Sequence, residues 1–382
     1  MDRTRWGLVA LVFFGGLMAA VQFAKVSLTL PLLAQSFGRD LASVAVLVSM
    51  VGLVGLVFGA MAGGIAAALG PGRTFLGGLV FGGALSLIQA TMPGYGGFAA
   101  LRVLEGFAHL ALVVGGPPLM AAAASDRDRP LAMGLWAVFF GLAFAIAARL
   151  FPLVTNAGGL PLLFAAHGVL MLATAAALWR SVPRIPVTRP SIDPVAMHHA
   201  IYGRLRTVAP GLGFVPYTFL FIAMLTFLPG LLGAPILATT LPLVTLMTTL
   251  LGGALCRRFA PHDVAAVGYA GTILGMLGLA AGVPGAAHLA FAALGVVPGA
   301  SFAAIPHLNP DPRDRTRATG AIAQLGNLGT VTGTPVVALL LGWGLAGVIG
   351  ITVTVAALGL ALTLWSGHAA SGTSAGDTVD VP

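Results

Sequence analysis

Long apolar runs follow one another along almost the whole of this sequence, with short polar connections between them. Each run is about 20 residues long, the length that a helix needs to cross the hydrocarbon core of a bilayer. Only 8% of the 382 residues are charged, whereas a soluble globular domain carries about 25%. We therefore predict an all-α integral membrane protein, because membrane-spanning strands would be alternating segments of about 10 residues.

The apolar runs predict about twelve transmembrane helices, arranged in two bundles of six, at residues 1–180 and 207–365. A linker rich in proline and arginine joins the bundles at 181–206, and residues 366–382 form a predicted disordered cytoplasmic tail. The predicted spans are 7–34, 42–69, 74–92, 97–122, 131–154, 160–180, 207–231, 236–256, 262–281, 287–307, 318–341 and 345–365.

The arginines predict how the chain is oriented. Fifteen of them fall in connections on one side of the predicted membrane, and only Arg39 falls in a connection on the other side. Cytoplasmic connections carry the excess of basic residues, so we predict cytoplasmic termini in a bacterial-type inner (plasma) membrane. The net charge of +8 is then a topology signal, and no nucleic-acid partner is expected.

Similar segments recur about half a chain length apart. Gly63–Gly70 closes the second predicted span and Gly253–Ala260 closes the eighth, while Asp128 precedes the fifth span and Asp314 the eleventh. The pattern suggests that the two halves arose by duplication. In transporters built from such repeats, the substrate site lies between the repeats near the middle of the membrane.

Three polar residues interrupt the fourth apolar span. Arg102, Glu105 and His109 are spaced i, i+3, i+7, so a helix places them on one face. Glu105, the only glutamate, lies about 12 Å along the helix, near the midplane. Ionisable residues at that depth are functional candidates, so we predict proton coupling by these three, with water reaching Glu105 through a cleft. The alternative is a permanent Arg–Glu ion pair and a structural histidine.

Lys25, the only lysine, shares a face of the first span with Gln22. We predict that both bind substrate, with Lys25 as the counter-charge of an anionic solute; the alternative is a lysine that extends to the membrane surface. Arg149 in the fifth span is either a further substrate ligand or a residue at the outer surface. Together these cations outnumber Glu105, which favours an anionic substrate.

Two further polar pairs lie in apolar spans. Gln324 and Asn327 in the eleventh span are spaced to hydrogen-bond a substrate, or equally to hold helices together. His167 and Met171 in the sixth span resemble the pairs of copper importers, but methionine commonly fills apolar gaps. We predict lining or core positions for this pair.

The segment Arg102–Gly106 matches an Arg-x-x-Gln/Glu-Gly signature of the fourth span in the major facilitator superfamily, and the whole chain resembles that family. The resemblance implies twelve helices, alternating access and a monomer. A second signature of the family, Gly-x-x-x-Asp-Arg-x-Gly-Arg-Arg after the second span, is only partly present. Gly63 and Gly70 match it, but Ala67 and Ala68 replace the Asp-Arg pair, so the charge relay of that loop lacks its acidic member.

Small residues form stripes on the second and eleventh spans, where they let helix backbones approach closely. In the resembling family these two helices meet across the halves, so we predict that the stripes form part of a moving gate; static packing is the alternative. The predicted gate residues are Gly55, Gly59, Gly63, Gly70, Arg73, Arg258, Gly329 and Gly333.

No motif in the sequence indicates catalysis. It has no Walker loop, no HExxH motif and no zinc-type Cys/His spacing, so we predict a non-enzyme without cofactor or metal site. The function predicted is proton-coupled secondary transport of a small anionic solute, with lipid, substrate and proton as partners. The sequence leaves open a drug or metabolite efflux antiporter, an importer of copper or another metal complex, and a membrane sensor that no longer transports.

Overall fold

A computed structural model describes residues 3–183, 185, 187 and 193–372, and every regular element in these residues is a helix. The chain divides into two compact units. The first holds Met1–Gly55 and Ala62–Ser191, and the second holds Leu56–Met61 and Ile192–Pro382. Helices dominate because a chain surrounded by lipid must satisfy its backbone hydrogen bonds internally.

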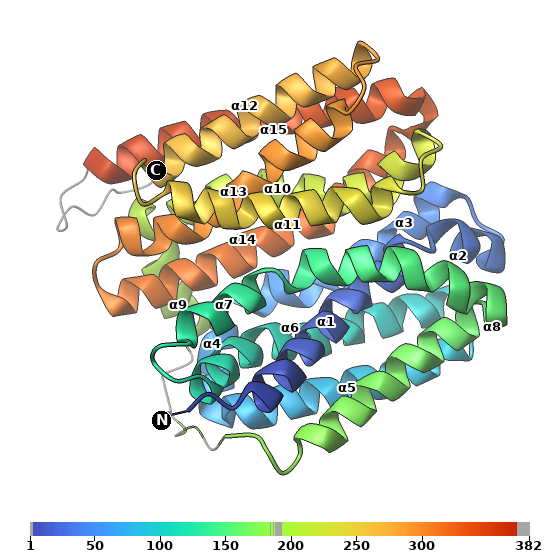
Figure 1. The fold of residues 1–382 in the computed structure, drawn as a ribbon, viewed down its shortest axis with the longest axis horizontal. Helices are drawn as coiled ribbons and strands as arrows, with labels where there is room; N and C mark the ends of the chain where they lie inside the picture. The colour runs from blue at the N-terminus through green and yellow to red at the C-terminus, as the bar shows by residue number, and fades with distance from the viewer. Residues whose placement is uncertain (1–2, 184, 186, 188–192, 373–382) are drawn as a thin grey trace. The chain divides into compact units, whose positions relative to one another are not determined.

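The helices of the first unit run from the blue to the green part of the chain (Figure 1). In this unit α1 packs against α6 and α8, and α5 packs against the same two helices. The helices α1, α5, α6 and α8 therefore surround one interior, in which the candidate site lies. The elements are α1 (Trp6–Ser27), α2 (Leu30–Phe37), α3 (Leu41–Ser49), α4 (Gly52–Leu69, of which Leu56–Met61 belong to the second unit), α5 (Pro71–Ala90), α6 (Tyr95–Ala123), α7 (Arg129–Ala137) and α8 (Phe139–Leu178).

Local sequence explains where these helices begin and break. Asp40 caps α3, because its carboxylate accepts hydrogen bonds from the Ser43 hydroxyl (2.6 Å) and backbone N–H (2.8 Å). These hydrogen bonds hold the pKa of Asp40 below its usual range. The long α8 leaves helical geometry at Gly158 and at Gly159, whose φ of +66° favours glycine. It therefore contains most of two predicted spans, 131–154 and 160–180.

The second unit contains six long helices in its described residues, coloured yellow-green to red in Figure 1. Here α10 packs on α14 and α15, and α12 packs on α13 and α15. The elements are α9 (Pro194–Tyr202), α10 (Leu205–Leu231), α11 (Leu237–Leu255), α12 (Pro261–Ala280), α13 (Ala286–Leu308), α14 (Pro312–Leu339), the 3-10 helix η1 (Leu341–Trp343) and α15 (Gly344–Gly372).

Among the residues that the structure describes, ten helical segments are long and apolar enough to cross a membrane. One of them is α8, which holds two spans, and α14, with charges in its first turns, is not among the ten. About twelve spans are therefore consistent with the structure.

The predicted tail is wrong at its start, because residues 366–372 continue α15, where Ala370 is buried against Ala209 and Leu308. The described residues do not include the rest of the predicted tail, 373–382. Nor do they include 184, 186 and 188–192 of the predicted linker.

Glycines bring α14 against α10 at the level of the backbone. A Cβ atom on Gly329 would lie 2.3 Å from the Val215 carbonyl oxygen, and one on Gly333 would lie 2.1 Å from the Phe219 carbonyl oxygen. No side chain fits into such a space without movement of one helix. Gly333 therefore permits a close helix contact of the kind that membrane proteins build from small residues.

Gly333→Ala is expected to destabilise the protein by about 1–3 kcal/mol, the usual cost of overpacking. Gly350→Ala in α15 is the matched control, because nothing lies within 4 Å of a Cβ atom at that position. There alanine should be neutral or stabilising by up to about 1 kcal/mol. Thermal unfolding in detergent measures both, and equal melting temperatures would contradict the close contact.

Candidate functional site

Three oppositely charged side chains meet in the interior of the first unit. Lys25 comes from α1, while Arg102 and Glu105 come from successive turns of α6, and each is 0% exposed. Lys25 Nζ lies 2.6 Å from Glu105 Oε1, and Arg102 Nη1 donates to Glu105 Oε2. The carboxylate of Glu105 is thus held between two cations.

Helix α5 contributes two polar side chains that connect this cluster. Lys25 Nζ donates to Ser86 Oγ at 3.0 Å and to Gln89 Oε1 at 2.7 Å. The Gln89 amide also donates to Glu105 Oε2 at 2.9 Å. Neither residue is predicted from the sequence, although Ser86 and Gln89 are an i, i+3 polar pair in an apolar span, which was the signal available.

His167 of α8 closes the cluster. Its Nε2 lies 3.1 Å from the Met18 carbonyl oxygen, which can only accept, so Nε2 carries the proton. Its Nδ1 faces Ser86 Oγ at 3.0 Å and Lys25 Nζ at 3.4 Å, and in a neutral ring this nitrogen is an acceptor. His167 therefore lies in a polar cluster. Met171, which lies four residues further along α8, packs in the apolar core.

Arg102 ties α6 to two other helices. Its Nε donates to the Leu47 carbonyl of α3 at 2.9 Å, and Nη1 donates to the Gln22 carbonyl of α1 at 2.8 Å. Its Nη2 and both polar atoms of the Gln22 side chain are buried without a hydrogen-bond partner in the described part of the chain. Buried polar atoms without partners are rare in folded proteins, so these groups are available to a ligand.

The charges of the cluster do not cancel. Lys25 and Arg102 carry two positive charges against the one negative charge of Glu105, with His167 neutral. A buried charge without a partner is costly in a medium of low dielectric constant. The cluster therefore favours a further negative charge.

The predicted ion pair of Arg102 and Glu105 is present, but the predicted access of water to Glu105 is wrong for this conformation. The carboxylate has no exposed surface, because Lys25, Arg102 and Gln89 occupy its hydrogen-bonding positions. His109 lies apart from Glu105 in the hydrogen-bond network: its Nδ1 is 3.1 Å from the Ala19 carbonyl oxygen.

Other predicted substrate ligands lie outside this cluster. Arg149 is exposed on α8, so it adds no charge to the interior. In the second unit the Gln324 amide is engaged by Tyr202 at 2.8 Å and by the Leu56 carbonyl at 2.9 Å. Asn327 donates to Ala323 of its own helix at 2.7 Å. The contacts of Gln324 join α14 to Tyr202 and Leu56, whereas that of Asn327 stays within its own helix; a substrate role for either residue stays a prediction.

The predicted gate residues are similarly divided. Gly329 and Gly333 face α10, and within the second unit a Cβ atom on Gly59 would lie 3.0 Å from the backbone of Gln324. Nothing lies within 4 Å of a Cβ atom on Gly63, while Gly70 has a φ of +91° between α4 and α5. Arg73 and Arg258 are exposed. A role for these residues in gating stays a prediction, and so does one for Gly55.

Comparison with known proteins decides the family. The sequence profile of the Major Facilitator Superfamily matches residues 12–306, most of the chain. The chain belongs to the major facilitator superfamily. Its members are membrane transporters, which agrees with the ten apolar helices described above.

Solved structures of this superfamily share the fold. A bacterial homologue of the human lysosomal transporter Spinster, in an inward-facing and occupied conformation, has a TM-score of 0.71 at 13% identity, with all of both chains covered. The human organic anion transporter MFSD10 has a TM-score of 0.66 at 20% identity, covering 94% of this chain and 98% of that one. A search of curated protein sequences gave no significant match.

Proposed function

We propose that this member of the superfamily is a secondary transporter that moves a small anionic solute together with a proton by alternating access. The observation that carries the proposal is the excess positive charge of the buried cluster formed by Lys25, Arg102 and Glu105. An anionic substrate would supply the missing negative charge. MFSD10, which has the same fold, is an organic anion transporter.

The contacts of Lys25 suggest how proton and substrate are coupled. Its ammonium group is shared among Glu105, Gln89 and Ser86. Protonation of Glu105 would remove its attraction for Lys25 and free that cation for an anion, assisted by the Gln22 amide and Arg102 Nη2, which lack partners. Proton and substrate then bind together, as symport requires.

Transport by the reconstituted protein tests this proposal. Purified protein in liposomes is offered a panel of small carboxylates and phosphate esters under an imposed inward proton gradient, and a pH-sensitive dye follows the external medium. We expect accumulation of at least one anion, with alkalinisation outside the liposomes. Anion uptake without any proton movement would contradict the coupling, and uptake restricted to cations or neutral solutes would contradict the substrate class.

Glu105→Gln is expected to abolish accumulation driven by the proton gradient while sparing counterflow exchange of the same anion. Glutamine keeps the size and hydrogen-bonding shape of the side chain but cannot exchange a proton in this pH range. Counterflow needs only substrate movement, so it also shows that the variant is folded. Unchanged pH dependence of uptake in this variant would assign the proton to another residue.

A further inference from the structure

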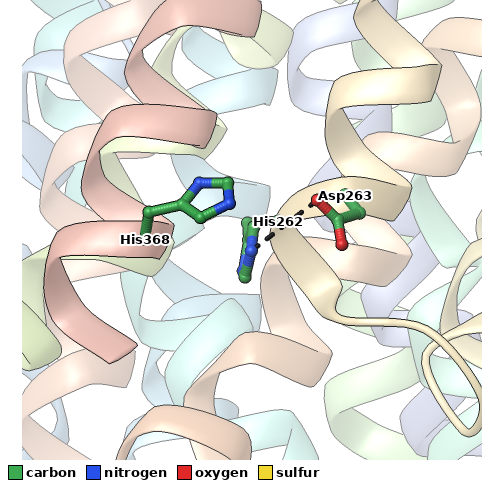
Figure 2. A group of neighbouring side chains, drawn as sticks. All are labelled: His262, Asp263 and His368. Atoms are coloured by element: carbon green, nitrogen blue, oxygen red, sulfur yellow. Dashed lines mark ion pairs between the residues drawn. The ribbon is translucent and has the colours of Figure 1, made fainter. Parts of the chain in front are cut away.

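Two histidines and an aspartate gather at one end of the second unit. His262 and Asp263 lie in the first turn of α12, and His368 lies near the end of α15. Their ligand atoms are all within 4.8 Å of one another, and Figure 2 shows the imidazole of His368 turned toward His262. We propose that these side chains bind a divalent transition-metal ion of the zinc class.

Hydrogen bonding prepares His368 as a ligand. Its Nδ1 lies 2.7 Å from the Leu364 carbonyl oxygen one turn earlier in α15. A carbonyl oxygen only accepts, so Nδ1 carries the proton and Nε2 keeps its lone pair. Metal-binding histidines are commonly oriented in this way by a hydrogen bond from the other ring nitrogen. His368 therefore has the tautomer that a metal ion requires.

The other two ligands are close to coordination geometry. His262 Nε2 lies 3.7 Å from Asp263 Oδ1, and the His262 and His368 rings are 4.5 Å apart between centroids at an interplanar angle of 62°. Zinc bonds to nitrogen and oxygen are about 2.0–2.2 Å long, so small side-chain rotations bring all three ligand atoms onto one ion. Two imidazoles and a carboxylate suit zinc or a neighbouring transition metal. Calcium and magnesium favour sites made of oxygen ligands.

The packing of α12 on α15 holds this arrangement. A Cβ atom on Gly367 would lie 2.3 Å from His262 Cβ and 2.5 Å from its Cγ. The absence of a side chain at Gly367 is therefore what allows His262 to approach α15. This close approach lies at the turn of α15 that precedes His368, so the backbone brings the two histidines together.

A small pocket of about 20 Å³ adjoins His262 and supplies a second, independent observation. His307 lines it, as does Thr363, whose buried hydroxyl has no hydrogen-bond partner among the described residues. A water molecule needs about 10–15 Å³ of such space. The pocket, which His262 lines but Asp263 and His368 do not, therefore has room for one water molecule beside a hydroxyl that lacks a partner, with His307 as a further nitrogen in its lining.

Bound metal would join the start of α12 to the end of α15. This end of the unit is predicted from the sequence to be cytoplasmic, so the ion would come from the cytoplasmic pool. Binding to the folded state alone raises stability with increasing metal concentration. The sequence spacing hides this site, because His368 lies far along the chain from His262. The site is also independent of Glu105 and of the proposed transport mechanism.

Titration with zinc chloride tests the proposal on full-length protein without a polyhistidine tag. Isothermal titration and competition with a fluorescent chelator should show one ion per chain and a rise in melting temperature that calcium and magnesium do not produce. The double variant H262A/H368A should lower zinc affinity at least about tenfold. His199→Ala, which removes an exposed histidine of α9, is the matched control and should retain wild-type affinity.

Unchanged affinity and stoichiometry in the double variant would overturn the proposal, as would an equal loss in the His199→Ala control. The melting temperature in the presence of a chelator shows whether each variant is folded. Gly367→Ala provides a second route, because it leaves every ligand in the chain but displaces His262. Its zinc affinity should fall, and wild-type affinity in that variant would contradict the geometry described here.

Discussion

Arg102→Leu should destabilise the protein by about 3–5 kcal/mol, the cost of breaking a buried ion pair by removing one partner. The guanidinium contacts Glu105 and donates to the carbonyl oxygens of Gln22 and Leu47. Leucine fills part of the volume but removes the hydrogen bonds to both carbonyls and one of the two cations that contact Glu105. The loss should appear as a lower melting temperature in detergent.

Arg149→Leu is the matched control, since it removes the same side chain from an exposed position on α8. Substitutions of that kind usually change stability by no more than about 0.5 kcal/mol. Equal effects of the two substitutions would mean that Arg102 is hydrated, and the buried cluster described here would then be wrong.

Lys25→Met is expected to weaken anion binding by about 10–100-fold, the equivalent of one hydrogen bond to a charged group. The variant leaves Arg102 and Glu105 as a neutral pair, so the cluster no longer favours an added negative charge. Lys25→Met should lower the stability of the protein less than Arg102→Leu does. Lys25 donates to side chains that can rearrange, whereas Arg102 donates to backbone carbonyls.

Direct binding to purified protein measures this effect, with the anion identified by the transport screen as ligand. Lys25→Arg is the companion variant, because it keeps the positive charge and should retain more affinity than Lys25→Met. Wild-type affinity in Lys25→Met would place the anion elsewhere in the protein.

The sequence was sufficient to predict the helical membrane fold and the pairing of Arg102 with Glu105. Helix periodicity fixes which residues share a face of one helix, and these two residues lie one turn apart. It does not fix which faces of different helices meet. Hence Lys25 was predicted as a free counter-charge, although the structure pairs it with Glu105, and the bridging role of Gln89 was not predicted.

The same limit applies to three predicted substrate ligands that lie outside the buried cluster. Arg149, Gln324 and Asn327 lie in apolar spans, but a polar residue there can face a neighbouring helix or the outside of the bundle as readily as a substrate. Composition also misplaced the start of the tail, because the small residues that suggest disorder at 366–372 pack closely as the last turns of α15. Burial of short side chains depends on the partner helix, which the local sequence does not contain.

The glycine contact between α14 and α10 has a mechanical consequence. Packed helices slide past each other when their side chains change rotamer, but at Gly329 and Gly333 carbonyl oxygens of α10 occupy the space where side chains would be. The Thr218 hydroxyl shares this space at Gly329, but at Gly333 only backbone atoms of Phe219 lie there, so a lengthwise shift would press backbone against backbone. We therefore expect α10 and α14 to move together during transport, with the larger displacements at other helix contacts.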